Sequence, residues 1–412
     1  MNTATAFDRA RVWARRNLLR TWYDAIITVI FGGAAIYVAY RMLRYVLITG
    51  RWEIVRVNLK LLLVGRFPDD ELWKVSAALA VVALWGGMLA GLVLARQRRA
   101  GTYVKQRVPP LRRARQLVSR SWPALVIVFV LLELSTTVGP WITVAVAVGA
   151  GVLGRLVGLA IGSAMPGWPT AVKALFVLAL AVTPIALTML LTSVIGWDEW
   201  GGFMINVFIA AAAIVLCFPL GVLLALGRRS TLPLLRAMCT AYIEVFRGSP
   251  LFVLLLLANN ALEFFVPSSM APGVVVRAIV VFTLFTAAYL AEIVRGGLQS
   301  IPPGQEEAAK AIGLSPVRTT FFIVLPQALR NVIPAQIGQF ISLFKDVALA
   351  GAAMSVFDLL NAATTITKQP EFAGQRLDVE TLAFVALLFW AGSYTMSRES
   401  QRLERKLGVG TR

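Results

Sequence analysis

Ionisable residues stand at helical spacing inside long apolar runs of this sequence. Glu244 and Arg247 lie three residues apart, and so do Glu292 and Arg295, with a glycine after each arginine. Residues three apart share one face of a helix, so each pair could be a structural ion pair that lowers the cost of charge at a membrane edge. Alternatively, Glu292 and Tyr289, one turn earlier, line a path for a polar solute. The residues alone leave both interpretations open.

Lys345 and Asp346 are adjacent charges in the middle of another apolar run. Each charge costs about 2.5–3.5 kcal/mol at the centre of a membrane helix. Adjacent residues do not face each other on a regular helix, so we expect each side chain to have its own partner. The two residues are therefore candidates for a solute path or gate, with pairing at a subunit interface as the alternative.

Composition excludes several other chemistries. The 412-residue chain contains no histidine and two cysteines, Cys217 and Cys239, which lie in or beside apolar runs. It therefore lacks the commonest general base and metal ligand, and two such thiols indicate neither a disulfide framework nor a metal site. The phosphate-binding pattern Gly-x-x-x-x-Gly-Lys-Ser/Thr does not occur, so we expect this chain to bind no ATP and no other cofactor.

The elements that position these charges are membrane-spanning helices. The chain is 58% hydrophobic and 15% charged, which is typical of an all-α integral membrane protein and of no soluble domain. Glycines at every fourth position, at 87 and 91 and at 154, 158 and 162, predict close packing between helices. We expect about ten spans, with eight as the alternative, near 25–47, 75–95, 124–162 (two spans that turn at Gly139-Pro140), 172–195, 203–227, 238–266, 274–296, 332–354 and 380–397.

Positive charge predicts the orientation of these spans. The net charge of +19 is typical of cytoplasmic loops that contact anionic lipid, rather than of nucleic-acid binding. Five arginines precede the first apolar run, which reads as a signal-anchor with a cytoplasmic N-terminus. The loop at 96–120 carries nine Lys or Arg residues and is expected inside, together with the loop at 297–331 and the C-terminal tail. The segment at 41–74 is placed outside although it carries seven Lys or Arg residues, so its side stays open.

The same runs divide the chain into four parts. We expect a basic cytoplasmic N-terminus at 1–24 and an N-terminal membrane region of about five spans at 25–195. A five-span core follows at 196–397 and contains the loop at 297–331. The tail at 398–412 is expected at the cytoplasmic surface, with a charged amphipathic helix at 397–408.

The loop inside the core has the residues of a helix–turn–helix. Pro303 suits a first helical turn, where Glu306 and Glu307 also favour the helix dipole. Gly313 stands where a left-handed cap ends a helix, and Ser315-Pro316 reads as the start of a second one. A short polar helix pair between two long apolar segments indicates a place where another protein docks. The alternative is an amphipathic connector on the membrane surface.

The spacing in this loop resembles a known pattern. Glu-Ala-Ala at 307–309, then Gly313, nine further residues and Ile323-x-Leu325-Pro326 resemble the cytoplasmic loop by which binding-protein-dependent ABC importer permeases engage their ATPase. The stretches at 242–251, 287–297 and 340–346 resemble signatures of three core spans in polar amino-acid permeases. Val347-Ala348 stands where that family usually has Thr-Ser. The N-terminal half, including 67–73, resembles the longer permeases of general L-amino-acid importers.

The resemblance implies a five-helix ABC type I importer core in the bacterial inner membrane, with both termini cytoplasmic. It implies a transporter of two homologous permease subunits, two ATPase subunits that bind ATP and Mg, and a periplasmic amino-acid-binding protein. A related cargo such as an opine or a polyamine is the first alternative. A passive channel would need no docking loop, and a membrane enzyme would need clustered His, Asp or Cys. The residues expected to couple to the ATPase are Glu307, Ala308, Ala309, Gly313, Ile323, Leu325 and Pro326.

Overall fold

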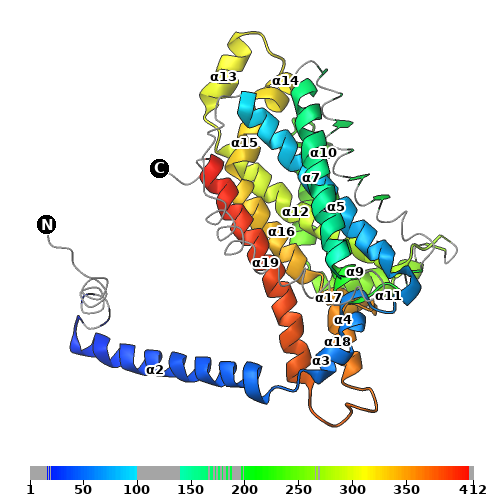
Figure 1. Cartoon of the computed structure of the whole chain (residues 1–412). Helices are drawn as coiled ribbons and strands as arrows, with labels where there is room; N and C mark the ends of the chain where they lie inside the picture. Colours follow the sequence, from blue (N-terminus) through cyan, green and yellow to red (C-terminus); the bar gives the residue numbers. More distant parts are fainter. Residues whose placement is uncertain are drawn as a thin grey trace. The chain divides into compact units, whose positions relative to one another are not determined.

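The computed structural model describes residues 20–99, 140–165, 199–264, 266–267 and 270–407, with isolated positions between 16 and 18 and between 168 and 197. In these ranges the regular structure is helical, which confirms the all-α prediction (Figure 1). The described β-type pairing consists of two isolated bridges, Gly65 with Trp200 and Gly202 with Asp358. The chain forms two compact units, one up to Ile54 and one from Val55 onwards.

The first unit contains α2 (Trp22–Arg44), which continues into a π-helical turn at Tyr45–Thr49. Its start is fixed by a capping box, because the Thr21 hydroxyl accepts from the Asp24 amide while the Asp24 carboxylate accepts from the Thr21 amide. No side chain of α2 is buried. Together with the π-helical turn, the helix is long and apolar enough to cross a membrane, as predicted for 25–47.

Six helical segments in the described residues are long and apolar enough to span a membrane, or seven if one bent pair counts as a span. Five of them match the predictions for 25–47, 75–95, 203–227, 274–296 and 380–397, and a sixth matches the second half of 124–162. The predicted spans in the first half of 124–162 and at 172–195 lie outside the continuously described residues. The six segments are Trp22–Thr49, Asp69–Arg96, Ala145–Ala164, Gly202–Arg228, Val274–Gln299 and Asp378–Glu404.

Two of the spans, α5 (Leu72–Arg99) and α7 (Pro140–Ala164), pack closely through their glycines. A methyl group on Gly154 would collide with the Leu84 carbonyl oxygen, and one on Gly158 with the Met88 carbonyl oxygen. Backbones approach this closely only where side chains are absent. The predicted glycine packing is therefore confirmed, and α7 begins at Pro140, where the turn was expected.

The core is built around α9 (Gly202–Arg228) and α12 (Val274–Gln299), which lie side by side (Figure 1). Gly221 allows this contact, because a Cβ there would be 2.7 Å from the Leu290 Cβ atom. The remaining core helices are α10 (Pro233–Gly248), α11 (Leu251–Asn260), α16 (Ile333–Asp346), α17 (Leu349–Met354), α18 (Leu359–Ile366) and α19 (Asp378–Leu407).

Two predicted spans are not single straight helices. The span expected at 238–266 is the pair α10 and α11, bent by 101° at Ser249-Pro250. Pro250 disfavours helical backbone at the residue before it, and Ser249 is extended. The span expected at 332–354 is divided into α16 and α17 at Val347-Ala348. At that point the Val347 carbonyl oxygen accepts a hydrogen bond from the Asn206 side chain, at 3.2 Å.

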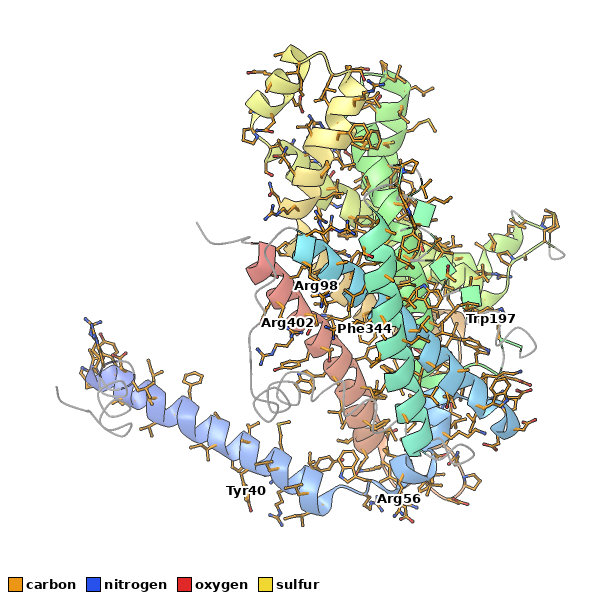
Figure 2. All side chains as sticks on the ribbon, turned by 45° about the horizontal axis from the view of Figure 1, so that its top comes forward. Tyr40, Arg56, Arg98, Trp197, Phe344 and Arg402 are labelled. Carbon is orange, nitrogen blue, oxygen red and sulfur yellow. The ribbon has the colours of Figure 1, made fainter. Side chains whose placement is uncertain are left out.

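The last helix, α19, packs on α16 through aromatic side chains. The rings of Phe344 and Phe389 are 5.4 Å apart, and a Cβ on Gly392 would be 2.6 Å from the Phe344 ring. Phe344 is labelled in Figure 2. The helix predicted for the tail at 397–408 is the final part of α19, which runs without interruption to Leu407.

Short helices occupy the two ends of the core. At the top of Figure 1 lie α13 (Pro303–Ala311), α14 (Pro316–Thr319), a π-helical turn at Thr320–Val324, and α15 (Leu325–Asn331). At the opposite end lie α4 (Leu59–Val64), α17 and α18. The other short elements are α3 (Glu53–Val57) and the 3-10 turns at Asp69–Glu71 and Leu262–Phe264.

Candidate functional site

The segment from Pro303 to Asn331 forms the predicted helix–turn–helix, and we call it the docking segment. Pro303 opens α13, and Gly313 ends it with a left-handed φ of 80°. The Leu314 amide then donates to the Ala309 carbonyl oxygen at 3.1 Å, as in a glycine-capped helix end. Ser315 caps α14 by accepting from the Arg318 amide at 3.5 Å. The local fold expected from these residue types is confirmed.

The outer face of the docking segment is apolar as well as charged. Glu307 and Ala308 are exposed, whereas Ala309 is buried. The large apolar side chains of Ile312, Val317, Phe321 and Phe322 are also exposed, with Ile312 at 75% and Phe322 at 61%. The sequence analysis did not include these four residues among those expected to contact the ATPase. Large apolar side chains in a polar loop were the signal that could have identified them. Clustered exposed apolar residues of this kind are typical of a protein-binding surface.

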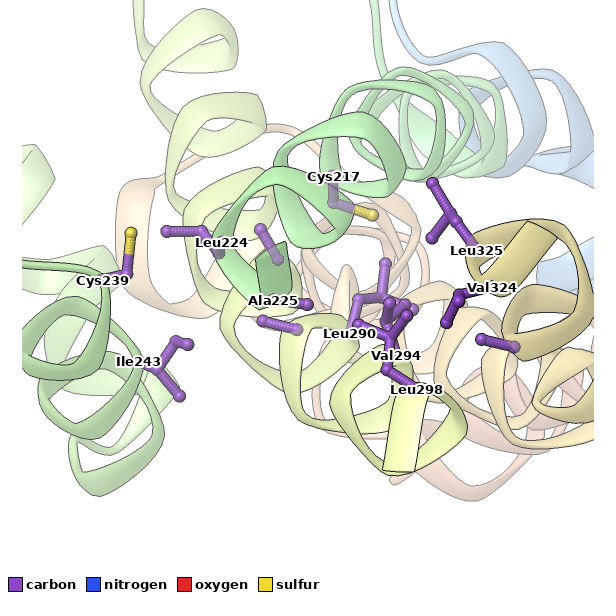
Figure 3. Packing of buried hydrophobic residues seen from close by; sticks show 13 residues of the cluster. Cys217, Leu224, Ala225, Cys239, Ile243, Leu290, Val294, Leu298, Val324 and Leu325 are labelled. Atoms are coloured by element: carbon purple, nitrogen blue, oxygen red, sulfur yellow. The ribbon is translucent and has the colours of Figure 1, made fainter. Parts of the chain in front are cut away.

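The inner face of the docking segment belongs to the core. Val324, Leu325 and Ala328 are buried in a cluster with side chains of α9, α10 and α12, including Leu224, Leu290, Val294 and Leu298 (Figure 3). Ile323 is half-buried and Pro326 is exposed. Because the cluster joins the C-terminal part of the segment to the long helices, a displacement of the segment would move α9 and α12 with it.

Polar contacts at the base of the docking segment strengthen this attachment. The Arg229 guanidinium, just after α9, lies 3.4 Å from the Glu306 carboxylate of α13. Gln327 donates to the Gln305 side chain at 3.3 Å, and Asn331 donates to the Ser300 hydroxyl at 3.1 Å. The docking segment is thus tied to the ends of both α9 and α12.

Beneath the docking segment, the Glu292 carboxylate forms ion pairs with three arginines. Its carboxylate lies 2.8 Å from Arg295, 2.7 Å from Arg228 and 3.8 Å from Arg247. The predicted pair of Glu292 with Arg295 is confirmed. Arg228, which comes from α9, was missed by sequence reasoning, because its contact with Glu292 joins residues 64 positions apart.

The pair predicted for Glu244 and Arg247 is not the one that forms. Glu244 lies 3.4 Å from Arg228 instead. The Arg247 guanidinium is 5.5 Å from the centre of the Tyr289 ring, and the Tyr289 hydroxyl donates to the Arg247 carbonyl oxygen at 3.4 Å. These contacts turn Arg247 toward α12, so that Tyr289, Glu292 and Arg247 lie together.

Lys345 and Asp346 are not part of this charge cluster. Lys345 is exposed and Asp346 is half-buried at the end of α16, directly before the break at Val347. Among the described residues, no salt bridge joins either of them to Glu292 or to any other side chain. Their role in a solute path stays a prediction.

The described residues hold no group of three or more His, Cys, Asp or Glu side chains that could bind a metal. Both cysteines are buried as free thiols. The described arrangement is an exposed, partly apolar surface on the docking segment, joined through the core to an ionic cluster between helices.

Comparisons with known proteins agree with this description. The family model described as "Binding-protein-dependent transport system inner membrane component" matches residues 217–408, which include the docking segment. The glutamate/glutamine/aspartate/asparagine transport system permease protein BztC of Rhodobacter capsulatus is 35% identical over 366 residues, covering 86% of this chain and 78% of that protein. The inner membrane amino-acid ABC transporter permease protein YhdY of Escherichia coli is 39% identical over 212 residues. That match covers 52% of this chain and 57% of the relative. One solved structure is described as "Crystal structure of an amino acid ABC transporter with histidines", and one of its chains is 28% identical to this chain. The match has a TM-score of 0.45 and covers 50% of this chain and 92% of that chain.

Proposed function

Since the chain belongs to the family of binding-protein-dependent transport system inner membrane components, we propose that it is the permease subunit of an ATP-driven importer of L-amino acids. The docking segment is the observation that supports this function best. Its outer face offers exposed apolar side chains beside the small residues Ala308 and Gly313, and its inner face is part of the core. A passive channel has no use for such a surface.

In this proposal the chain does no chemistry of its own. A partner ATPase binds ATP and Mg and supplies the free energy, and the docking segment receives the motion of that partner. Glu307, Ala308 and Gly313 contact the ATPase, and the buried Ala309 supports them from beneath. Ile323, Leu325 and Pro326 lie where the π-helical turn meets α15 and pass the motion on to the core. Because the inner face is packed on α9 and α12, closure of the ATPase turns these helices and opens the solute path to the opposite side.

The family implies an ATPase and a substrate-binding protein as partners. We propose two ATPase copies and a second, homologous permease, because a solute path of this kind runs between two permease cores. We also propose that the docking segment and both termini face the cytoplasm of a bacterial cell. The positive charges near the docking segment, including Arg228, Arg229 and Arg236, support this orientation.

The transported solutes are proposed from the relatives and from the charge cluster. The printed names of two relatives specify amino acids, among them glutamate, glutamine, aspartate and asparagine for the protein of Rhodobacter capsulatus. Tyr289 and Glu292, with Arg247 beside them, present an aromatic ring and both signs of charge, which suit a zwitterion with a polar side chain. Lys345 and Asp346 are proposed to line the same path.

Purification of the tagged chain in mild detergent, combined with uptake assays in cells that lack the gene, tests this function. We expect an ATPase subunit and a second permease to copurify, and uptake of several radiolabelled L-amino acids to be lost in the deletion strain. Recovery of the chain alone, with unchanged uptake of all the amino acids, would contradict the proposal.

A further inference from the structure

A cavity of about 600 Å³ lies at the end of the core opposite the docking segment. Its walls come from segments far apart in the sequence: Arg66 after α4, Trp197, the start of α12, and residues of the stretch from Ser355 to Thr365. Cavities of this size commonly hold small ligands. Under the proposed function this end faces the binding protein, from which the solute arrives.

The backbone around Arg66 is fixed on both sides. Gly65 has a left-handed φ of 72°, and a Cβ there would lie 2.5 Å from the Gly201 Cα atom. It also forms an antiparallel bridge with Trp200. On the other side, the Phe67 ring is fully buried against Trp200, with ring centres 6.3 Å apart. Because both neighbours are held by the core, the backbone position of Arg66 is set before any ligand binds, while its side chain is exposed.

The Arg66 guanidinium is held over an aromatic ring but has no carboxylate partner. It lies 5.0 Å from the centre of the Phe357 ring, a cation–π distance. The Phe357 carbonyl oxygen in turn accepts from the Gly202 amide at 2.9 Å, which fixes the backbone at Phe357 to the start of α9. Among the described residues, no acidic side chain forms a salt bridge with Arg66. Among the described residues that line the cavity, Arg66 is also the one that carries a charge.

The rest of the cavity adds neutral polar groups and apolar surface. Asn361 and Thr365 lie one turn apart on α18 and share one face, and Ser355 lies at the end of α17. Trp197 and the first residues of α12 supply apolar area. The described lining, with one positive charge and hydroxyl and amide groups, fits a small solute that carries a carboxylate. A guanidinium binds that group through two parallel hydrogen bonds.

We propose that this cavity is a binding site for the transported amino acid, in which Arg66 holds the carboxylate of the solute. The inference rests on the proposed function. It assigns a role to the N-terminal region as well, because the segment that carries Arg66 lies before the five-helix core and completes the wall of the cavity.

Alkylation of a cysteine in the cavity tests the site directly. The full transporter is reconstituted in liposomes with Thr365→Cys, and its reaction with a small maleimide is timed with and without saturating L-glutamine and L-glutamate. The native cysteines are buried and react slowly. At about ten times the dissociation constant, bound solute should slow the reaction about tenfold. Thr364→Cys is the matched control, because its side chain is exposed and does not line the cavity.

Substitutions of Arg66 then identify the group that holds the solute. Arg66→Gln combined with Thr365→Cys should abolish the protection, and Arg66→Lys should retain part of it. Lys60→Ala should leave it intact, because Lys60 pairs with Asp69 at 2.7 Å in the same part of the chain and does not line the cavity. Thermal unfolding of each variant separates loss of binding from loss of fold. Full protection in Arg66→Gln would overturn the assignment of Arg66.

Two further outcomes are distinguishable. If the wild-type liposomes import L-glutamine but Thr365→Cys is not protected, the cavity is not a site for the solute while the proposed function stands. If no amino acid is imported, the proposed function itself fails. The assay is repeated in phosphatidylcholine and in phosphatidylglycerol liposomes. Protection that requires phosphatidylglycerol, with no added amino acid, would mean that Arg66 binds a lipid phosphate and would overturn the proposal.

Discussion

The guanidinium of Arg228 lies 2.7 Å from the carboxylate of Glu292, which joins the end of α9 to α12 directly below the docking segment. Both side chains are largely shielded, with 25% and 16% of their surface exposed. Arg295 and Arg247 contact the same carboxylate. One acidic side chain therefore holds three helices together at the level where motion of the docking segment reaches the spans.

Glu292→Gln should destabilise the core, because three guanidinium groups lose the charge that they share. Removing one partner of a shielded, charge-assisted contact costs about 1–3 kcal/mol. We expect a lower melting temperature of the purified chain and reduced uptake. Glu399→Gln is the control, because Glu399 pairs with Arg402 near the end of α19 and its side chain is 57% exposed. Equal melting temperatures for the two variants would refute a structural role for the Glu292 cluster.

Arg229 and Glu306 form a link between α9 and the docking helix that a charge exchange can test. Arg229→Glu alone places two carboxylates at this contact and should lower uptake per ATP hydrolysed. The exchange Arg229→Glu with Glu306→Arg should restore much of it. Because the pair is exposed, its effect on stability should stay below about 1 kcal/mol. A double variant no better than either single variant would show that the contact does not contribute to coupling.

Gly154→Leu should disrupt the packing of α5 on α7, since the new side chain would collide with the backbone at Leu84. Overpacking of this kind costs about 1–3 kcal/mol or more. Gly149→Leu, on the same helix, is the matched control because a Cβ at that position meets no atom within 4 Å. The two variants are compared by thermal unfolding in detergent. Equal stability would mean that α5 and α7 do not pack as described.

The sequence predicted the elements whose signals are local. The docking segment followed from Pro303, Gly313 and Ser315, because caps and first-turn residues act within one helical turn. The long apolar helices followed from composition. The bend at Pro250 also had a local signal, the proline itself, but the apolar run at 238–266 was long enough to be interpreted as a single span. By contrast, the contact of Arg228 with Glu292 could not be predicted, because it depends on how α9 and α12 pack.

The break at Val347 and the cavity around Arg66 were beyond prediction for the same reason. The break depends on Asn206, which is distant in the sequence and donates to the Val347 carbonyl oxygen. The cavity forms where Arg66 meets Phe357. Such contacts arise only in the folded core, so residue type and spacing carry no signal for them.

Asp358 should make the stability of the core depend on pH. It caps α18 and accepts from Asn206 at 3.2 Å, and burial raises the pKa of its carboxyl from 3.8 to about 6. Because the folded state holds this proton more tightly, the added stability is complete below about pH 4 and is lost as pH rises through 6, on the order of 3 kcal/mol. Thermal unfolding from pH 4 to 8 should show this step.

Asp358→Asn is the control for this step. Asparagine is also a good N-cap residue and can still accept from the Asn361 amide, but it does not titrate. The decline in stability between about pH 4 and pH 6 should therefore be absent from this variant. An identical pH profile in the wild type and in Asp358→Asn would assign the step to other groups.

The measurement that tests coupling through the docking segment most directly is ATP-driven uptake in liposomes, with ATP hydrolysis followed in the same sample, for the wild type and Glu307→Lys. Glu307 is exposed on α13, so the substitution should leave the fold intact and weaken contact with the ATPase. Glu371→Lys, exposed in the loop after α18, is the matched control. We predict that Glu307→Lys lowers uptake per ATP hydrolysed about tenfold or more, which corresponds to a loss of about 1.4 kcal/mol at the interface with the ATPase. Glu371→Lys should leave this ratio unchanged. Unchanged coupling in Glu307→Lys would contradict the account.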